Sequence, residues 1–177
     1  MDYEMLKYFT EFWCSDDTDP YERIYIQWGL SKFFPAKTMS SHVTNWNRNT
    51  SVKFRTDVCS SCKLGFDIDL KSLSAEEYQF VKQAVSNYDL MKPVIFDGDL
   101  YRLVSPYEGN HCAINYVSKD QQRAVLFAFD LHPRYMEPLT NVRLQGLAPD
   151  RTYTVRETNL MPGKKSELTC DGKQYSG

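Results

Sequence analysis

The chain has 177 residues, enough for one hydrophobic core or for parts of two domains. Hydrophobic residues make up 42% and charged residues 25%, a globular composition that excludes a disordered chain. The formal net charge is −2 and the longest basic run is Lys164–Lys165, which argues against nucleic-acid binding by phosphate neutralisation. Because no apolar run approaches the ~20 residues of a membrane-spanning helix, no membrane partner is expected.

The first predicted elements are a strand over residues 6–13 and a helix that begins at Pro20. Asp19 is the predicted N-cap, Pro20 occupies the first helical position, and Glu22 follows three residues after the cap. Pro35 marks the expected end of the helix. The predicted apolar face consists of Tyr21, Ile24, Tyr25 and Trp28.

Strand and helix patterns continue to alternate up to residue 92. A short strand is predicted over 37–43, and "KLGFDIDL" (63–70) predicts another in which Gly65 permits close approach of a neighbour. The helical pattern between them includes Val52, Arg55, Val58 and Cys59. A last helix begins with a capping box from Ser74 to Glu77, and its expected apolar face consists of Tyr78, Val81, Val85 and Tyr88. This order predicts parallel strands with helical crossovers.

The pattern changes at Pro93, which is expected to end the last helix. Short β-type runs follow, separated by Gly, Pro, Asn and Asp: "PVIFDGDLYRLVSP", "HCAINYVS", "RAVLFAFDL", "NVRLQGL" and "RTYTVRET". Such spacing is typical of an antiparallel sandwich, so we place a domain boundary near 92–95.

Cysteine usage gives no disulfide or zinc framework. The chain has five cysteines, and Cys59 and Cys62 form a single CxxC without a second pair at zinc spacing. We interpret these two as reduced structural thiols, with metal or redox work as the alternative. No cofactor and no metal site are expected.

Three aspartates are crowded before the first helix, in "FWCSDDTDPYERIYIQWG" (12–29). Asp19 is explained by capping, which leaves Asp16 and Asp17 as turn residues or as chemically active groups. The share of aromatic residues is 14% with twelve Tyr, which fits either a sugar-binding cleft or an ordinary β-rich core.

Several segments in order resemble glycoside hydrolase family 36, the microbial α-galactosidases. Residues 12–35 are similar to the family's W-x-S-D-[DN]-T-D…R…Q-x-G…P segment, and "MSSHVTNWNRNTS" (39–51) to its M-x-x-H-V segment. "CKLGFDIDLKSLSAEE" (62–77) resembles G-x-[LF]-G-[YF]-E-[LI]-D, with Asp67 where Glu is usual. "GDLYRLVSPYEGN" (98–110) is similar to the segment that opens the family's C-terminal β domain.

The resemblance implies a fold class that combines α/β and all-β parts. Residues 1–93 would be the last third of a (β/α)8 TIM barrel, and residues 94–177 an antiparallel β-sandwich domain that is truncated at its end. The chain would therefore be the C-terminal fragment of a larger enzyme, with Met1 in place of an internal residue. Its true N-terminus would be missing, so the sequence assigns no localisation.

The resemblance also implies chemistry. The family retains anomeric configuration through a covalent galactosyl-enzyme, with one aspartate as nucleophile and another as general acid/base. Asp16 matches the acid/base, and Trp13 matches an aromatic that lines the galactose pocket. Asp17 is a further candidate, to orient substrate or to tune Asp16 through like charge, which would raise the pKa of the acid. The nucleophile belongs to a K-x-D stretch that no part of this chain matches.

Other residues receive weaker expectations. His42 is either a cleft residue or a satisfied histidine of the barrel, and Arg23 is expected to be a structural ion-pair partner. His111 and His132 are assigned no role.

The expected substrate is a terminal α-linked galactose on an oligosaccharide such as raffinose or melibiose, and the parent enzyme is compatible with a homo-oligomer. Three alternatives stay open: a sandwich module that contacts carbohydrate without catalysis, the product of a truncated reading frame, and a fragment of a relative that acts on N-acetylgalactosamine or makes raffinose.

Overall fold

The structure is a computed structural model, and it describes residues 3–46, 49–137 and 141–177. The chain divides into two compact units, residues 1–69 and residues 70–177. The hypothesis about Met1 lies outside the described residues. The expected domain boundary near residue 93 stays a prediction.

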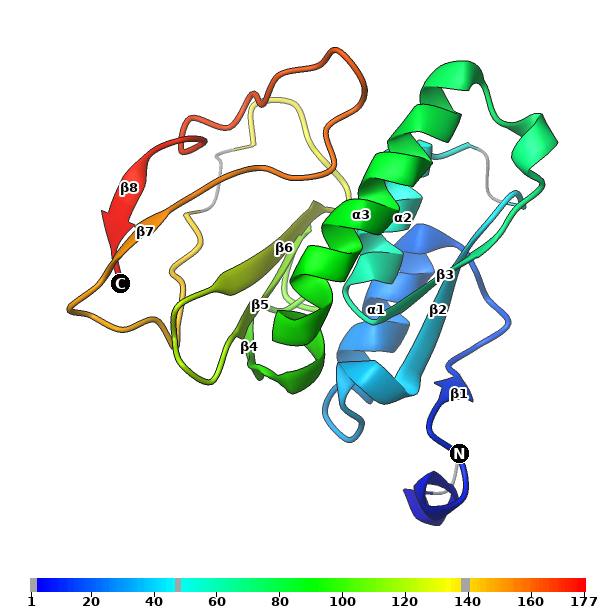
Figure 1. The fold of residues 1–177 in the computed structure, drawn as a ribbon, viewed down its shortest axis with the longest axis horizontal. Coiled ribbons are helices and arrows are strands. Elements are labelled where there is room, and N and C mark those ends of the chain that lie inside the picture. Colours follow the sequence, from blue (N-terminus) through cyan, green and yellow to red (C-terminus); the bar gives the residue numbers. More distant parts are fainter. Residues whose placement is uncertain (1–2, 47–48, 138–140) are drawn as a thin grey trace. The chain divides into compact units, whose positions relative to one another are not determined.

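The first unit contains a three-stranded parallel sheet in the order β1-β2-β3 (Figure 1). β1 is Phe12–Trp13, β2 is Met39–Thr44 and β3 is Lys63–Asp67. Helix α1 connects β1 to β2, and helix α2 connects β2 to β3. The predicted alternation and the predicted parallel pairing are therefore confirmed.

Helix α1 (Pro20–Leu30) begins as the sequence predicts. The carboxylate of Asp19 accepts hydrogen bonds from the backbone N–H groups of Tyr21 and Glu22, with Pro20 at the first position. Of the predicted apolar face, Ile24 and Trp28 are buried, whereas Tyr21 and Tyr25 are only half-buried. The side chains that α1 buries are Pro20, Arg23, Ile24, Gln27 and Trp28.

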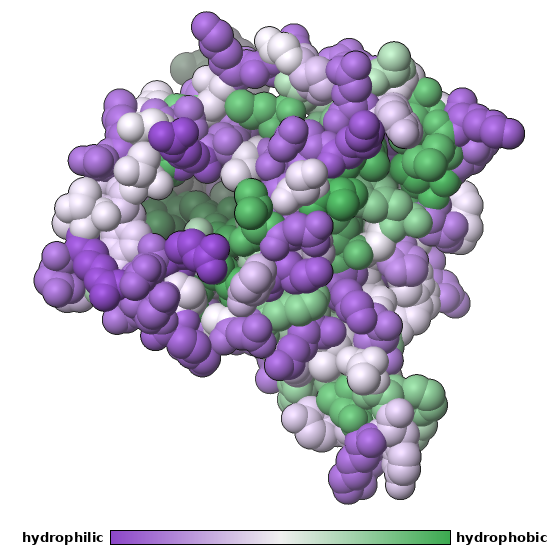
Figure 2. All heavy atoms as spheres, viewed as in Figure 1, coloured by the Kyte–Doolittle hydropathy of each residue, from purple (hydrophilic) through white to green (hydrophobic). Residues whose placement is uncertain are grey.

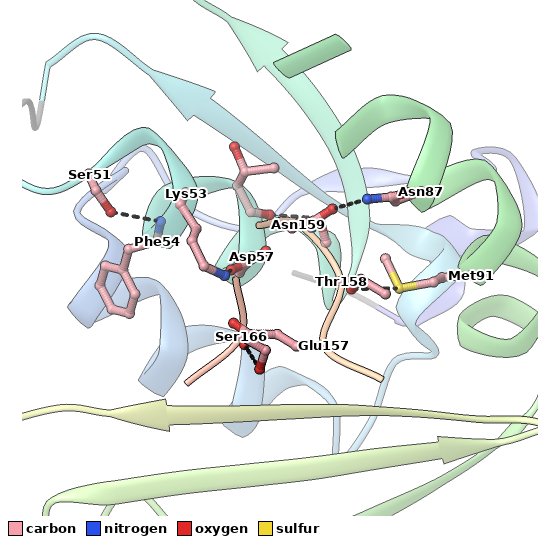
Figure 3. Close-up of polar contacts among 12 residues, drawn as sticks. Ser51, Lys53, Phe54, Asp57, Asn87, Met91, Glu157, Thr158, Asn159 and Ser166 are labelled. Carbon is pink, nitrogen blue, oxygen red and sulfur yellow. Dashed lines mark hydrogen bonds and ion pairs between the residues drawn. The ribbon is translucent and has the colours of Figure 1, made fainter. Parts of the chain in front are cut away.

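Helix α2 (Val52–Ser60) is also confirmed, and its N-cap is Ser51, whose hydroxyl accepts from the N–H of Phe54 at 3.1 Å (Figure 3). On the surface of the helix, Lys53 and Asp57 form an ion pair at 2.7 Å. Burial of Val52, Val58 and Cys59 attaches the helix to the sheet.

The start of the chain differs from the prediction. Instead of a strand over 6–13, residues Tyr3–Lys7 form a 3-10 helix, η1, and only Phe12 and Trp13 pair with β2. The N–H groups of Tyr8 and Phe9 both donate to the carbonyl of Met5, so this backbone closes a turn and is not extended. Aromatic content predicted a strand here, but η1 leaves apolar side chains on its surface (Figure 2).

The second unit begins with a short 3-10 helix, η3 (Leu70–Ser72), which is followed by helix α3 (Ala75–Asp97). Another short 3-10 helix, η2 (Ala36–Thr38), precedes β2 in the first unit. The predicted capping box is confirmed, because Ser74 and Glu77 exchange reciprocal side-chain to backbone bonds at 3.1 and 2.9 Å. The predicted face is correct for Val81 and Tyr88 and wrong for Tyr78 and Val85, which are exposed.

The prediction that Pro93 ends this helix is wrong. Proline lacks the N–H that would bond to the carbonyl four residues earlier, so α3 continues with one hydrogen bond fewer. Continuation buries Val94 and Ile95, each about 2% exposed, which offsets the lost bond. The helix ends at Gly98, whose N–H bonds to the carbonyl of Val94 at 3.0 Å.

Two antiparallel sheets follow in the second unit. β4 (Asp99–Val104), β5 (His111–Val117) and β6 (Ala124–Asp130) form one sheet in chain order, and α3 contacts β5 and β6. β7 (Thr152–Thr154) and β8 (Gln174–Ser176) form the other. The antiparallel character predicted for this part is confirmed.

One predicted β-run is not a strand. Residues 141–147 have no ladder partner; their carbonyls accept from side chains instead, Gln145 from Asn115 at 3.0 Å and Gly146 from Gln121 at 2.8 Å. Gly146 has φ +81° and lies against the ring of Tyr101, where a side chain would not fit.

The long C-terminal segment is held to α3 by a side-chain pair. Asn87 donates to Asn159 at 2.9 Å, and Asn159 is 3% exposed with a left-handed φ of 54° (Figure 3). Further along, Ser166 donates to the carboxylate of Glu157 at 2.5 Å. Among the described helices, none is long and apolar enough to cross a membrane.

Candidate active site

The candidate site lies in the first unit, at the carboxyl end of β1. Trp13 is the last residue of β1, and its indole Nε1–H donates to Oδ1 of Asp16 at 3.0 Å. The carboxyl group of Asp16 and about 40% of Trp13 are exposed. The structure thus brings two of the three predicted site residues into direct contact. The sequence analysis named both residues but did not predict this hydrogen bond between them.

Asp17, the third predicted residue, has a local structural role. Its backbone N–H donates to the hydroxyl of Ser15 at 3.1 Å, and its Oδ1 accepts from the N–H of Asp19 at 2.9 Å. These bonds order the turn between β1 and α1. Asp17 therefore fixes the backbone that carries Asp16.

Two residues from other elements contact the ring of Trp13. The ring of His42, on β2, lies 4.6 Å from it between centroids at an angle of 58°. The guanidinium of Arg23, on α1, lies 5.0 Å from the ring centroid. The indole is therefore held by an imidazole and by a cation while its N–H is bound to Asp16.

Gly65 makes room for His42, as the sequence predicts. The two residues are register partners on β3 and β2, and a Cβ built on Gly65 would lie 2.2 Å from Cδ2 of the imidazole. Only glycine permits the ring to lie over β3 in this position. His42 is half-buried and packs against Trp13, and both interpretations offered for it remain predictions.

Arg23 is buried as a structural residue would be, but within the described part of the chain it has no carboxylate partner, so the expected ion pair is not found there. Its side chain is 1% exposed, and its two terminal nitrogens donate to backbone carbonyls, Nη1 to Ser15 at 3.3 Å and Nη2 to Ser40 at 3.4 Å. Helical spacing from Pro20 through Arg23 to Gln27 places these residues on one face, a signal that our count of apolar residues missed.

Gln27 completes the buried polar contacts of α1. Its Nε2 donates to the carbonyl of Val58 at 3.0 Å and to the hydroxyl of Ser61 at 2.9 Å, and its Oε1 accepts from Ser41 at 2.6 Å. One side chain thereby joins α1 to β2 and to the end of α2. These bonds fix the helix that presents Arg23 to Trp13.

Glu11 connects all three strands beside the site. Its Oε2 accepts from Lys63 at 2.6 Å and from the hydroxyl of Ser40 at 2.9 Å. The hydrogen bond from Lys63, followed by that from Ser40, lowers the pKa of the exposed Glu11 carboxyl from its ordinary value. Glu11 is thus held as an anion near the positive side chain of Lys63. The sequence analysis missed this contact.

The cysteines take no part in this site. All five are free thiols, and burial raises the pKa of Cys59 to about 11 and that of Cys62 further still. Such thiols are protonated and unreactive near neutral pH, which agrees with their interpretation as structural residues. Among the described residues no cluster of His, Cys, Asp and Glu could hold a metal ion.

Two family models match consecutive parts of the chain. The Melibiase family model matches residues 1–98, and the model for the glycosyl hydrolase family 36 C-terminal domain matches residues 111–177. A probable α-galactosidase G of Aspergillus terreus is 36% identical over 97% of this chain, which covers 24% of that protein. The chain therefore spans about a quarter of the length of such relatives.

Solved structures agree with the sequence matches. Variants of α-galactosidase AgaA from Geobacillus stearothermophilus, in complex with raffinose and with stachyose, superpose with a TM-score of 0.80; identity is 34% and 35%, over 84% of this chain and 21% of theirs. α-Galactosidase AgaB from the same organism gives 0.83 at 32% identity, over 98% of this chain and 25% of its own.

Proposed function

The chain belongs to glycoside hydrolase family 36, and from this membership we propose that it forms the part of a retaining α-galactosidase that supplies the general acid/base, Asp16. The substrate would be a terminal α-linked galactose on an oligosaccharide such as raffinose or melibiose. Complexes of related enzymes with raffinose and stachyose support this substrate class. In the same proposal, residues 1–93 are the end of a (β/α)8 barrel and residues 94–177 a β-sandwich domain.

The observation that carries the proposal is the hydrogen bond from Trp13 to Asp16 at an exposed strand end. Catalytic residues of (β/α)8 enzymes lie at the carboxyl ends of barrel strands. The indole N–H occupies Oδ1, so Oδ2 is available to hold the proton that is transferred. The exposed part of the Trp13 ring offers an apolar surface for the face of a sugar.

The reaction would proceed in two steps. Asp16 gives its proton to the glycosidic oxygen while a second carboxylate attacks the anomeric carbon, which releases the aglycone and leaves a galactosyl ester. Asp16, now ionised, accepts a proton from the water that attacks this ester, and galactose leaves with the second carboxylate restored. That nucleophile would come from a K-x-D segment, which these 177 residues do not contain.

Asp16→Ala, made in the complete gene product that contains these residues, tests the proposal. We expect kcat/KM for raffinose to fall by about 10²–10⁴-fold. An aryl α-galactoside with an activated leaving group needs little protonation, so its kcat/KM should change far less. Azide should restore turnover by attacking the galactosyl ester and forming galactosyl azide.

Asp150→Ala is the matched control, because Asp150 is an exposed aspartate far along the chain. It should leave both substrates unaffected. If Asp16→Ala hydrolyses raffinose at the wild-type rate, Asp16 is not the acid and Asp17 becomes the candidate. Faster hydrolysis of an α-N-acetylgalactosaminide than of the galactoside would contradict the proposed substrate.

A further inference from the structure

Arg23 is a buried cation without a carboxylate partner among the described residues. It is 1% exposed, the bulkiest of the fully buried side chains, and its Nε has no hydrogen-bond partner within the described part of the chain. Burial of an unpaired charge is expensive, and natural proteins normally compensate it with an opposite charge. Arg23 instead has two long hydrogen bonds to carbonyls and the face of an indole.

Arg23 contacts both the residue that hydrogen-bonds to the carboxylate of Asp16 and the residue that precedes Asp16 in the chain. The guanidinium covers the ring of Trp13, whose N–H binds Asp16, and Nη1 binds the carbonyl of Ser15, the residue directly before Asp16. Nη2 binds the carbonyl of Ser40 on β2, so the same side chain ties the turn to the sheet. Both the side-chain partner and the backbone of Asp16 therefore depend on Arg23.

Building on the proposed function, we propose that Arg23 is a positioning residue for Asp16. It fixes the indole of Trp13 and the carbonyl of Ser15, and it thereby keeps Oδ1 of Asp16 on the indole N–H and Oδ2 directed to the substrate. Arg23 does not touch the sugar, because it is buried beneath Trp13.

The chemistry of the side chain explains why arginine is needed. A planar guanidinium can lie flat against an indole and donate from two nitrogens to two separate carbonyls at once. The ammonium of lysine is a compact point charge that cannot satisfy both carbonyls and also stack on the ring. Arg23→Lys keeps the charge and most of the length, so it tests the geometry of the guanidinium rather than the charge.

The experiment measures kcat/KM of the complete gene product on two substrates, raffinose and an activated aryl α-galactoside. Displacement of a catalytic group by about 1 Å can cost about 10²-fold in rate. We expect Arg23→Lys to lower kcat/KM for raffinose by about 10–100-fold and that for the aryl galactoside by less than about 3-fold. Trp13→Phe keeps an aromatic ring but removes the N–H, and it should show the same selective loss.

Arg55→Lys is the matched control. Arg55 is 3% exposed, lies in a helix like Arg23 and also donates to a backbone carbonyl, that of Thr44, but has no ring contact with Trp13. Both lysine variants should melt earlier than the wild type, while only Arg23→Lys should discriminate between the substrates. Equal losses on both substrates in Arg23→Lys would show a purely structural role and overturn the proposal.

Two further results separate this inference from the proposed function. If Asp16→Ala shows no selective loss on raffinose, the proposed function fails and this inference fails with it. If Asp16→Ala is selective but Trp13→Phe hydrolyses raffinose like the wild type, the acid assignment stands and the positioning role of Arg23 through Trp13 is wrong. The result for Trp13→Phe tests the positioning role of Arg23 even if the Arg23→Lys variant does not fold.

Discussion

The two units of the chain differ in what they bury. The described part of residues 1–69 buries two arginines, a glutamine and several hydroxyl side chains: Thr18, Arg23, Gln27, Ser40, Ser41, Thr44, Arg55, Thr56, Ser60 and Ser61. In the described part of residues 70–177 the buried polar side chains are only Asn115 and Asn159. The second unit buries mainly apolar side chains, among them Ala113, Tyr116 and Phe127 of its larger antiparallel sheet.

The difference bears on how firmly each unit fixes its side chains. Buried polar groups fix a unique arrangement because each needs a partner at a definite place, whereas apolar packing tolerates small shifts. The first unit holds Asp16 and Trp13 at a strand end, and its buried side chains bond to the backbone around them. Polar burial therefore accompanies the candidate site, and apolar burial predominates in the described part of the second unit.

The largest expected effect is the loss of a buried aromatic side chain from the second unit. Phe127 on β6 is 6% exposed and lies edge-on to Tyr116 at 6.3 Å between ring centroids. Phe127→Ala should lower the free energy of unfolding by about 3–5 kcal/mol, since it removes a buried ring and leaves a cavity. Leu126→Ala, on the exposed face of the same strand, should cost less than about 1 kcal/mol in the same denaturant titration.

The next largest effect is expected from the loss of buried hydrogen bonds in the first unit. Gln27→Leu has nearly the size of the native residue but leaves Ser41, Val58 and Ser61 without their bonds to the amide. We expect a loss of about 1–3 kcal/mol, because the Ser41 hydroxyl loses its bond to the amide, while the Ser61 hydroxyl and the Val58 carbonyl keep only the bond to each other. Gln83→Leu on the exposed surface of α3 is the control, expected within about 0.5 kcal/mol. Equal stability of both variants would mean that the hydrogen bonds of Gln27 contribute nothing to the stability of the first unit.

One glycine in each unit, Gly65 in the first and Gly98 in the second, leaves no room for a side chain, and the obstacle differs between them. A Cβ on Gly98 would meet the backbone carbonyls of Val94 and Val117 at 2.3 and 2.5 Å, whereas a Cβ on Gly65 would meet the imidazole of His42, which can rotate. Gly98→Ala should therefore destabilise by about 2–3 kcal/mol and Gly65→Ala by about 1 kcal/mol.

Gly109→Ala is the control for both, since a Cβ there has nothing within 4 Å. Thermal melting gives the order of the three variants. A greater loss for Gly65→Ala than for Gly98→Ala would show that the imidazole is held as rigidly as backbone.

The smallest effect concerns a property that both units share, buried thiols. Burial raises the pKa of Cys59 from 9.0 to about 11, and that of Cys112 to about 12. A pKa that is higher in the folded state than in the unfolded state stabilises the fold fully below pH 9, and the contribution is lost as the pH rises from about 9 to about 11. For Cys59 the loss between pH 8 and pH 10 should be about 1 kcal/mol.

Urea titrations at both pH values measure this loss. Cys59→Ala removes the thiol, so its stability should fall by about 1 kcal/mol less than that of the wild type over the same interval. An identical pH dependence in the two proteins would contradict the assigned rise in pKa.

The sequence by itself determined the elements whose signals are local. Asp19 with Pro20, and Ser74 with Glu77, mark helix starts because a cap is satisfied within three residues. Alternation of strand and helix patterns predicted the parallel sheet, and regular turn residues predicted antiparallel strands in the second part of the chain. Gly65 as a point of close approach was also predictable, since glycine within a strand has few other uses.

Only the tertiary structure decided which polar groups are buried and what they hold. Arg23 bonds to Ser40, seventeen residues away, and Gln27 to Ser61, thirty-four residues away, so no local pattern contains these partners. The helix continues through Pro93 and buries Val94 and Ile95. The carbonyls of Gln145 and Gly146 accept hydrogen bonds from the side chains of Asn115 and Gln121, which are distant in the sequence. The free energy of each choice depends on contacts between distant segments, which outweigh the local preference of the chain.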